Sequence, residues 1–203
     1  RDHIDQVLLE KNMPPQLALL PHVESSFNPN AYSHANAAGM WQFTRPTGQR
    51  FMRIDDIIDE RMDPYISAEA AMDLLEYNFQ VLDSWPLALT AYNHGVGGMS
   101  RAVRETETSS IEKIIANYKG PRFGFVGRNF YPQFLAVNDI ERNIDQYFES
   151  VDYAVPPNFT EVRLDSYVDS QGIEESLGIA VSQLREDNPS LRNVVWQLSL
   201  IHI

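Results

Sequence analysis

Hydrophobic residues in the first three quarters of the chain recur mostly at the spacing of an α-helix. The clearest example is segment 67–85, in which Ala71, Leu74, Leu75 and Val81 form an apolar stripe. The other segments with this spacing are 3–12, 14–28, 86–93, 99–106, 110–118 and 130–147. The pattern therefore predicts a mainly α-helical domain built from short helices.

The pattern changes after residue 150. Pro156 and Pro157 and the loss of helical spacing predict a linker. The segments that follow are a strand (160–168), two short helices (173–178 and 180–187) and a β-branched, alternating strand (193–203). We therefore expect two domains, a helical one at residues 1–150 and a small βααβ module at residues 158–203.

Composition agrees with an ordinary globular protein. The chain has 203 residues, of which 43% are hydrophobic and 22% charged, enough for one full core and a small appendage. It contains no cysteine, which excludes disulfides and thiolate ligands, and no apolar run long enough to span a membrane. Because the chain starts at Arg1 without an apolar leader, we expect a mature or trimmed chain that has lost any targeting segment or lipid anchor.

The formal net charge of -12 argues against a partner with a phosphate surface. Residues 1–150 carry a net charge of -7 and residues 151–203 a net charge of -5, so neither part forms a basic domain. Such a field repels phosphates, and we expect no binding to nucleic acid or to anionic lipid.

One carboxylate has an unusual position. Leu17, Leu20 and Glu24 are spaced i, i+3 and i+7, so the acid shares a helix face with apolar residues and should point inward or into a cleft. Desolvation and the negative end of the helix dipole would both raise its pKa, and such an acid can donate a proton near neutral pH. The alternative is a glutamate that reaches water or caps amides, which is commoner on a helix.

Three more segments have residues that suit a sugar-binding cleft. They are "SHANAAGMWQF" at 33–43, "LTAYNHGVGG" at 89–98 and "FGFVGRNFYPQF" at 123–134. They combine small residues, aromatic rings and amides. Each segment taken alone fits an ordinary core turn or loop equally well.

Together, in order and spacing, five segments resemble the goose-lysozyme-like catalytic domain of bacterial lytic transglycosylases, most closely the membrane-bound D type. The segments are "LALLPHVESSFNP", "GMWQFTRPTG", "DPYISAEAAMDLLEYNF", "WPLALTAYNHGVG" and "RNFYPQFLA". The resemblance covers about residues 1–145 and implies a lysozyme-like fold with a cleft for peptidoglycan strands. The C-terminal module, with "LGIAVSQLREDNPSL", resembles a degenerate LysM carbohydrate-binding repeat.

The resemblance places Glu24 at the family's single catalytic glutamate. In the family this residue protonates the glycosidic oxygen between N-acetylmuramic acid and N-acetylglucosamine. As carboxylate it then takes the proton of the muramoyl 6-hydroxyl, which closes onto C1 and gives a 1,6-anhydro product. A single acid needs no partner carboxylate, unlike an ordinary glycosidase. The neighbouring acids, which we expect to be solvated, are Asp55, Asp56, Glu60 and Asp63.

Further positions match substrate-binding residues of the family. They are Ser33 near the reacting sugar, Met40 and Gln42 along the subsites, Tyr92 and Asn93 beside the acid, and Phe130 or Tyr131. Phe130 stands where the family has a tyrosine, so either ring of the pair could face Glu24. Asn36 replaces a usual glycine, which asparagine tolerates because it accepts left-handed backbone angles.

The resulting hypothesis is a periplasmic or outer-membrane-associated lytic transglycosylase of a Gram-negative bacterium, monomeric and without cofactor or metal. One alternative is a lysozyme-type hydrolase, in which Glu24 admits water in place of the 6-hydroxyl. Another is a catalytically silent glycan-binding scaffold. Because peptidoglycan stem peptides carry carboxylates, the acidic charge also suggests a preference for deacetylated, cationic glycan, unless the acidic surface lies away from the cleft.

Overall fold

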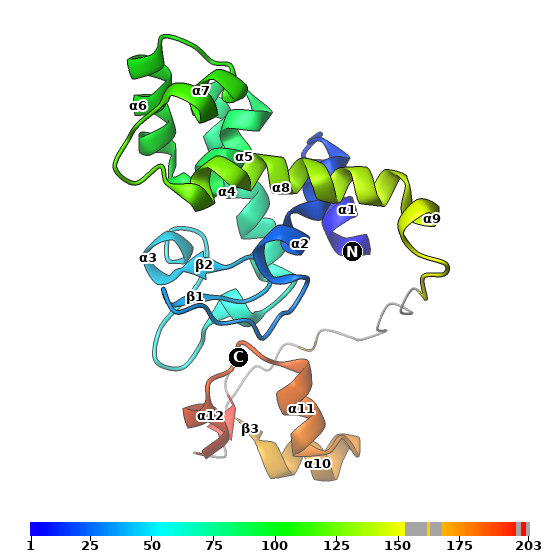
Figure 1. Cartoon of the computed structure of the whole chain (residues 1–203). Helices are drawn as coiled ribbons and strands as arrows, with labels where there is room; N and C mark the ends of the chain where they lie inside the picture. Colours follow the sequence, from blue (N-terminus) through cyan, green and yellow to red (C-terminus); the bar gives the residue numbers. More distant parts are fainter. Residues whose placement is uncertain (153–161, 163–167, 198–199, 202–203) are drawn as a thin grey trace. The chain divides into compact units, whose positions relative to one another are not determined.

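The computed structural model describes residues 1–152, 162, 168–197 and 200–201 (Figure 1). The chain folds as two compact units, each made of two stretches of sequence. The first contains Arg1–Ser26 and Ala68–Val151, and the second contains Phe27–Ser67 and Asp152–Ile203. Among the described residues, no helix is long and apolar enough to cross a membrane.

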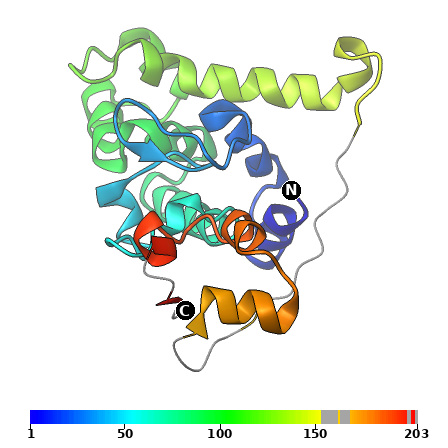
Figure 2. The ribbon, with the colours of Figure 1, turned by 90° about the horizontal axis from the view of Figure 1, so that it is seen from below.

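The first unit is helical, in agreement with the mainly α prediction. Its elements are α1 (Asp2–Glu10), the 3-10 helix η1 (Pro15–Leu19), α2 (Leu20–Ser25), α4 (Ile66–Leu82, which begins in the second unit), α5 (Trp85–His94), α6 (Val96–Thr106), α7 (Ile111–Asn117), α8 (Phe125–Arg142) and α9 (Ile144–Tyr147). α8 is the longest of them and stands out as a straight rod in Figure 2.

The segment predicted as one helix at residues 14–28 is divided into η1 and α2. Pro21 lies in the first turn of α2, where its missing N–H leaves no helical hydrogen bond unmade. Ser26 then ends the helix in the left-handed conformation, with φ of 54°. Pro21 thus lies at the start of a second helix, and Glu24 falls in the last turn of that short helix.

Helices α5, α6 and α7 and the loop before α8 enclose one hydrophobic cluster. Its buried members are Leu87, Ala91, Met99, Ala102, Ile111, Ile114, Tyr118 and Phe123. Helix α8 also contacts α5, α2 and η1. One long helix therefore packs on both the element that carries Glu24 and the element that carries Tyr92.

The second unit contains a small hairpin followed by loops. Strand β1 (Ala37–Ala38) pairs antiparallel with β2 (Phe43–Thr44), and α3 (Arg45–Gly48) and the 3-10 helix η2 (Glu60–Met62) follow. The C-terminal part contributes β3 (Val168–Asp169), α10 (Ser170–Leu177), α11 (Val181–Asp187), α12 (Asn193–Gln197) and β4 (Leu200–Ile201), with β3 and β4 antiparallel.

The predicted βααβ order of the C-terminal module is wrong in one respect, because three helices separate its strands. Residues 193–197, predicted as part of a strand, form α12. Val195 of α12 lies in one buried cluster with Ile58 and Leu191, and Leu191, which precedes the helix, forms an isolated β-bridge with Ile58. Most of the strand predicted at 160–168 lies outside the described residues, and the likeness to a LysM repeat stays a prediction.

Candidate active site

Glu24 is accessible to solvent and has a strongly raised pKa. Its side chain is partly exposed, in the last turn of α2. Desolvation by the surrounding protein nevertheless raises its pKa to about 8. At pH 7 roughly nine in ten Glu24 side chains are then protonated. The carboxyl group can therefore act as a proton donor, as the apolar face of its helix predicts.

Tyr92 is the predicted site residue that the structure brings next to Glu24. It lies in α5, which has Pro86 in its first turn and ends at His94, before Gly95 with φ of 82°. Burial raises the pKa of the Tyr92 phenol well above 10, and the charge of Glu24 raises it further. The phenol therefore stays protonated and is close enough to sense the ionisation of Glu24. Asn93, the next residue, is exposed.

The neighbouring rings of α8 have different surroundings. Phe130 is buried, with 3% of its surface exposed. Tyr131 packs against the hydrophobic cluster of α5 to α7, and its phenol has its pKa raised by burial and by the charge of Glu112, the acid on α7. The hydroxyl of Tyr131 therefore senses Glu112, and which ring of the pair faces the substrate stays a prediction.

Ser33, Met40 and Gln42 belong to the second unit, where they lie in or beside the hairpin. The Ser33 hydroxyl accepts a hydrogen bond of 3.0 Å from the Ala37 N–H. The Gln42 side-chain amide donates to the Gly39 carbonyl at 2.8 Å. Met40 is buried, with 7% exposed. These contacts give Ser33 and Gln42 a structural role in shaping the hairpin, in addition to the substrate contacts predicted for them.

Backbone strain is concentrated in the same stretch of sequence. The non-glycine residues with positive φ here are Ser26, Phe27, Asn36 and Gln42. Asn36 has φ of 59°, in the left-handed region that asparagine was expected to accept here. Residues held in this region commonly cluster at functional sites.

Sequence reasoning missed the ion pair that holds this hairpin. Arg61 and Asp59 are both buried and share two hydrogen bonds of 2.8 Å. Arg61 Nη1 also donates to the carbonyls of Asn36 and Phe43, each at 3.0 Å. Arg61 therefore ties the two ends of the hairpin segment to the loop that precedes α4. Nothing in the sequence distinguishes this pair from the acidic residues around it.

The backbone of the hairpin also packs closely against the backbone at Arg61. Gly39 has φ of 77°, and a Cβ placed on it would lie 1.8 Å from the Arg61 carbonyl oxygen. Only glycine fits there. The part of the chain that the structure describes holds no group of three or more His, Asp or Glu side chains able to bind a metal ion.

The transglycosylase SLT domain model matches residues 4–115, more than half of the chain. The chain belongs to the transglycosylase SLT family. It is 30% identical over 186 residues to the membrane-bound lytic murein transglycosylase D of Escherichia coli K12, covering 90% of this chain and 40% of that protein. The protein of the same name in strain CFT073 gives the same figures.

The solved structures agree at the level of the SLT fold. An inactive mutant of the lytic transglycosylase Slt from Pseudomonas aeruginosa superimposes with a TM-score of 0.57 at 16% identity. The match covers 71% of this chain and 24% of that one. The predicted lysozyme-like fold is thereby confirmed. The chain spans less than half the length of the curated SLT relatives it matches.

Proposed function

We propose that this chain is a peptidoglycan lytic transglycosylase in which Glu24 acts first as acid and then as base. The observation that carries the proposal is a partly exposed glutamate whose burial raises its pKa to about 8, within an SLT domain. The relatives are named as lytic murein transglycosylases. A location in the bacterial envelope follows from the same substrate, since peptidoglycan lies there.

The reaction uses Glu24 twice. The protonated carboxyl gives its proton to the glycosidic oxygen between N-acetylmuramic acid and N-acetylglucosamine, and the bond from C1 to that oxygen breaks. The 6-hydroxyl oxygen of the same muramoyl residue then bonds to C1, and its proton returns to Glu24. No water is consumed, and the enzyme ends as it began. A low-dielectric setting suits both steps, because it favours the neutral acid before cleavage and makes the carboxylate a stronger base afterwards.

Tyr92 supports this cycle by its position. Its phenol is close enough to Glu24 to sense the charge, and its raised pKa keeps its proton available for donation to the carboxylate. A hydrogen bond to the ionised form would stabilise the intermediate state without removing the acid's proton at the start. Ser33, Met40, Gln42, Asn93 and Phe130 are proposed as substrate contacts.

Mass spectrometry of the muropeptides released from purified cell wall tests the proposal. Products lighter by one water than the hydrolytic ones, absent with Glu24→Gln, are expected. Glu112→Gln serves as a matched control because Glu112 is an exposed acid on α7 and should retain activity. Fully hydrated products would instead identify a lysozyme-type hydrolase. Binding without any release would identify a glycan-binding scaffold.

A further inference from the structure

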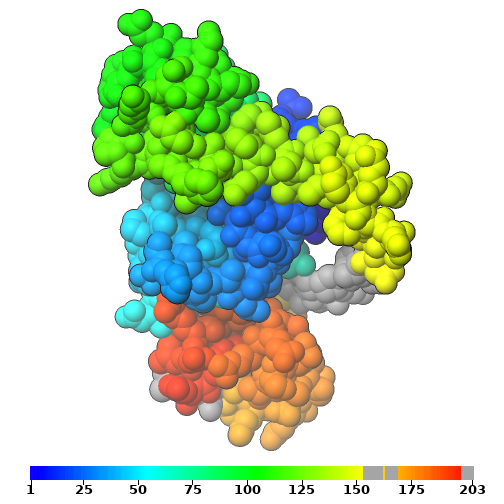
Figure 3. Space-filling model, viewed as in Figure 1, coloured from blue at the N-terminus to red at the C-terminus, as the bar shows by residue number. Residues whose placement is uncertain are grey.

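Positive charge is segregated in one part of this acidic chain. Residues 84–104 and 113–138 contain six Lys and Arg residues and no Asp or Glu, although the whole chain has 28 acidic residues against 16 basic ones. The two stretches meet in space, because α5 contacts both α6 and α8. Figure 3 shows α6, α7 and the start of α8 as one solvent-facing part of the surface.

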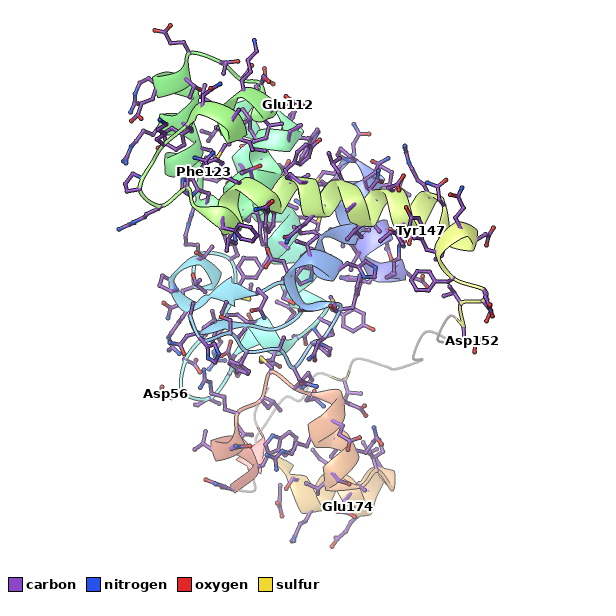
Figure 4. All side chains as sticks on the ribbon, in the orientation of Figure 1. Asp56, Glu112, Phe123, Tyr147, Asp152 and Glu174 are labelled. Carbon is purple, nitrogen blue, oxygen red and sulfur yellow. The ribbon has the colours of Figure 1, made fainter. Side chains whose placement is uncertain are left out.

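His94 marks where the two stretches meet. Its ring packs edge-on against Phe123, with the ring centroids 5.0 Å apart. It also lies over the first turn of α6, where a Cβ on Gly98 would come within 2.7 Å of its Nε2. A Cβ on Gly127, in the first turns of α8, would be 3.9 Å from its Nδ1. His94 therefore packs on the start of α6 and on the loop between α7 and α8, where Figure 4 labels Phe123, and lies near the start of α8.

Two arginines flank this histidine. Arg101 follows Gly98 by three residues and so lies on the same face of α6. Arg122 immediately precedes Phe123. Both are close enough for their charges to lower the pKa of His94, in addition to the larger effect of burial. Arg101 and Arg122 are exposed, and neither has an ion pair or hydrogen bond among the residues with described positions.

Arg128, by contrast, has a structural role. Its guanidinium lies 5.3 Å from the centroid of the Phe123 ring and donates to the backbone carbonyls of Ile115 and Tyr118. It thus fixes the loop that presents Arg122. The nearest acids in sequence are Glu105, Glu107 and Glu112. Glu105 follows Arg101 by four residues and so lies one turn further along the same face of α6, but it forms no ion pair with Arg101 among the described residues. Glu107 follows the last residue of α6, and Glu112 receives a hydrogen bond from Ser110.

We propose that Arg101 and Arg122, with His94 between them, bind carboxylates of the peptidoglycan stem peptides. This inference rests on the proposed function, because it names the part of that substrate that the enzyme recognises beyond the sugar. His94 closes the same helix, α5, that carries Tyr92 and Asn93, so the patch adjoins predicted substrate contacts. This basic patch allows a protein with a net charge of -12 to bind an anionic polymer locally. The acidic charge then requires no preference for deacetylated glycan.

The test is co-sedimentation of the chain carrying Glu24→Gln with insoluble cell wall. This assay measures binding alone, because the Glu24→Gln chain should not cleave the wall. Arg101→Ala and Arg122→Ala should each weaken binding to peptide-bearing wall roughly twofold to fivefold at low salt, as expected for exposed charge pairs. The difference should shrink at high salt because exposed charges are screened. Arg142→Ala removes an equal exposed charge at the far end of α8 and should have no such effect.

Removal of the stem peptides by an amidase distinguishes the outcomes. On stripped glycan the two variants should bind as tightly as their parent. An equal loss on stripped glycan would overturn the proposal in favour of sugar or lactyl contacts, and a loss no larger than that of Arg142→Ala would overturn it as well. Because this measurement needs no cleavage, failure of the transglycosylase reaction would appear separately, in the product analysis of the parent chain.

Discussion

Replacement of Glu24 by glutamine should stabilise the folded protein at alkaline pH. In the unfolded chain this carboxyl has the ordinary pKa of 4.5, and in the folded chain its pKa is about 8. Between these two values the folded state holds a proton that the unfolded state has released. The free energy of unfolding of the wild-type chain therefore falls as pH rises through this window, whereas glutamine carries no proton to lose.

The magnitude follows from the difference between the two pKa values. Each pKa unit corresponds to about 1.4 kcal/mol, so the full window corresponds to about 5 kcal/mol. Solvent reaching the partly exposed carboxyl lowers this figure, and we expect about 2–5 kcal/mol at pH 8 and above. Below pH 4 both chains carry a neutral group at position 24, and their stabilities should converge.

Urea unfolding followed by circular dichroism, at pH values from 4 to 9, measures this effect. The gap between Glu24→Gln and wild type should open across the window. Glu112→Gln provides a control of opposite sign, because the hydrogen bond from Ser110 lowers the pKa of Glu112, so that variant should gain no stability at high pH. A Glu24→Gln gap that is constant with pH would refute the assignment of a desolvated, protonated acid.

Three further outcomes are expected. The rate of anhydro-product release should fall as pH rises above about 8, since Glu24 must be protonated to start the reaction, and a pH–rate profile on purified wall checks this. Asp59→Asn should destabilise the chain by about 3–5 kcal/mol in urea unfolding, because it leaves the buried Arg61 without its partner. Gly39→Ala should lower the melting temperature and the activity together, because its Cβ would overlap the Arg61 carbonyl, whereas alanine at the open position Gly97 should do neither.

Helical segments were predictable because each carries its own signal. Segment 67–85 has the spacing of an amphipathic helix, and the structure forms α4 at Ile66–Leu82. Pro86, in the first turn, and Gly95, just after the last residue, likewise mark the two ends of α5. In contrast, "NVVWQ" has the composition of a strand but forms α12, since contact of Leu191 and Val195 with Ile58 overrides local preference. That contact joins residues more than 130 positions apart and leaves no local pattern.

The candidate site also has some features that the local sequence predicts and others that only the folded chain shows. Glu24 was a candidate because its spacing placed it beside apolar residues, and the desolvation that raises its pKa agrees with that expectation, whereas its catalytic role stays a prediction. The surroundings of Tyr131 could not be predicted, because its packing against the cluster of α5 to α7 and its proximity to Glu112 depend on how α8 is rotated against α7. Asp59 and Arg61 escaped notice for a related reason. Charged residues in a polar loop are normally solvated, and only the folded chain shows that this pair is buried.

The distribution of charge over the surface says more about possible partners than the net charge does. A total of -12 argues against anionic partners only if every face of the molecule shares it. Here the acid-free stretches 84–104 and 113–138 come together around His94, so one face can attract what the rest repels. Because exposed charges act over about 10 Å at 0.1 M salt, the field near Arg101 and Arg122 is set by the charges close to them, including Glu105 on the same face of α6, and not by the distant acids. An acidic protein can therefore still attract an acidic polymer at one patch of its surface.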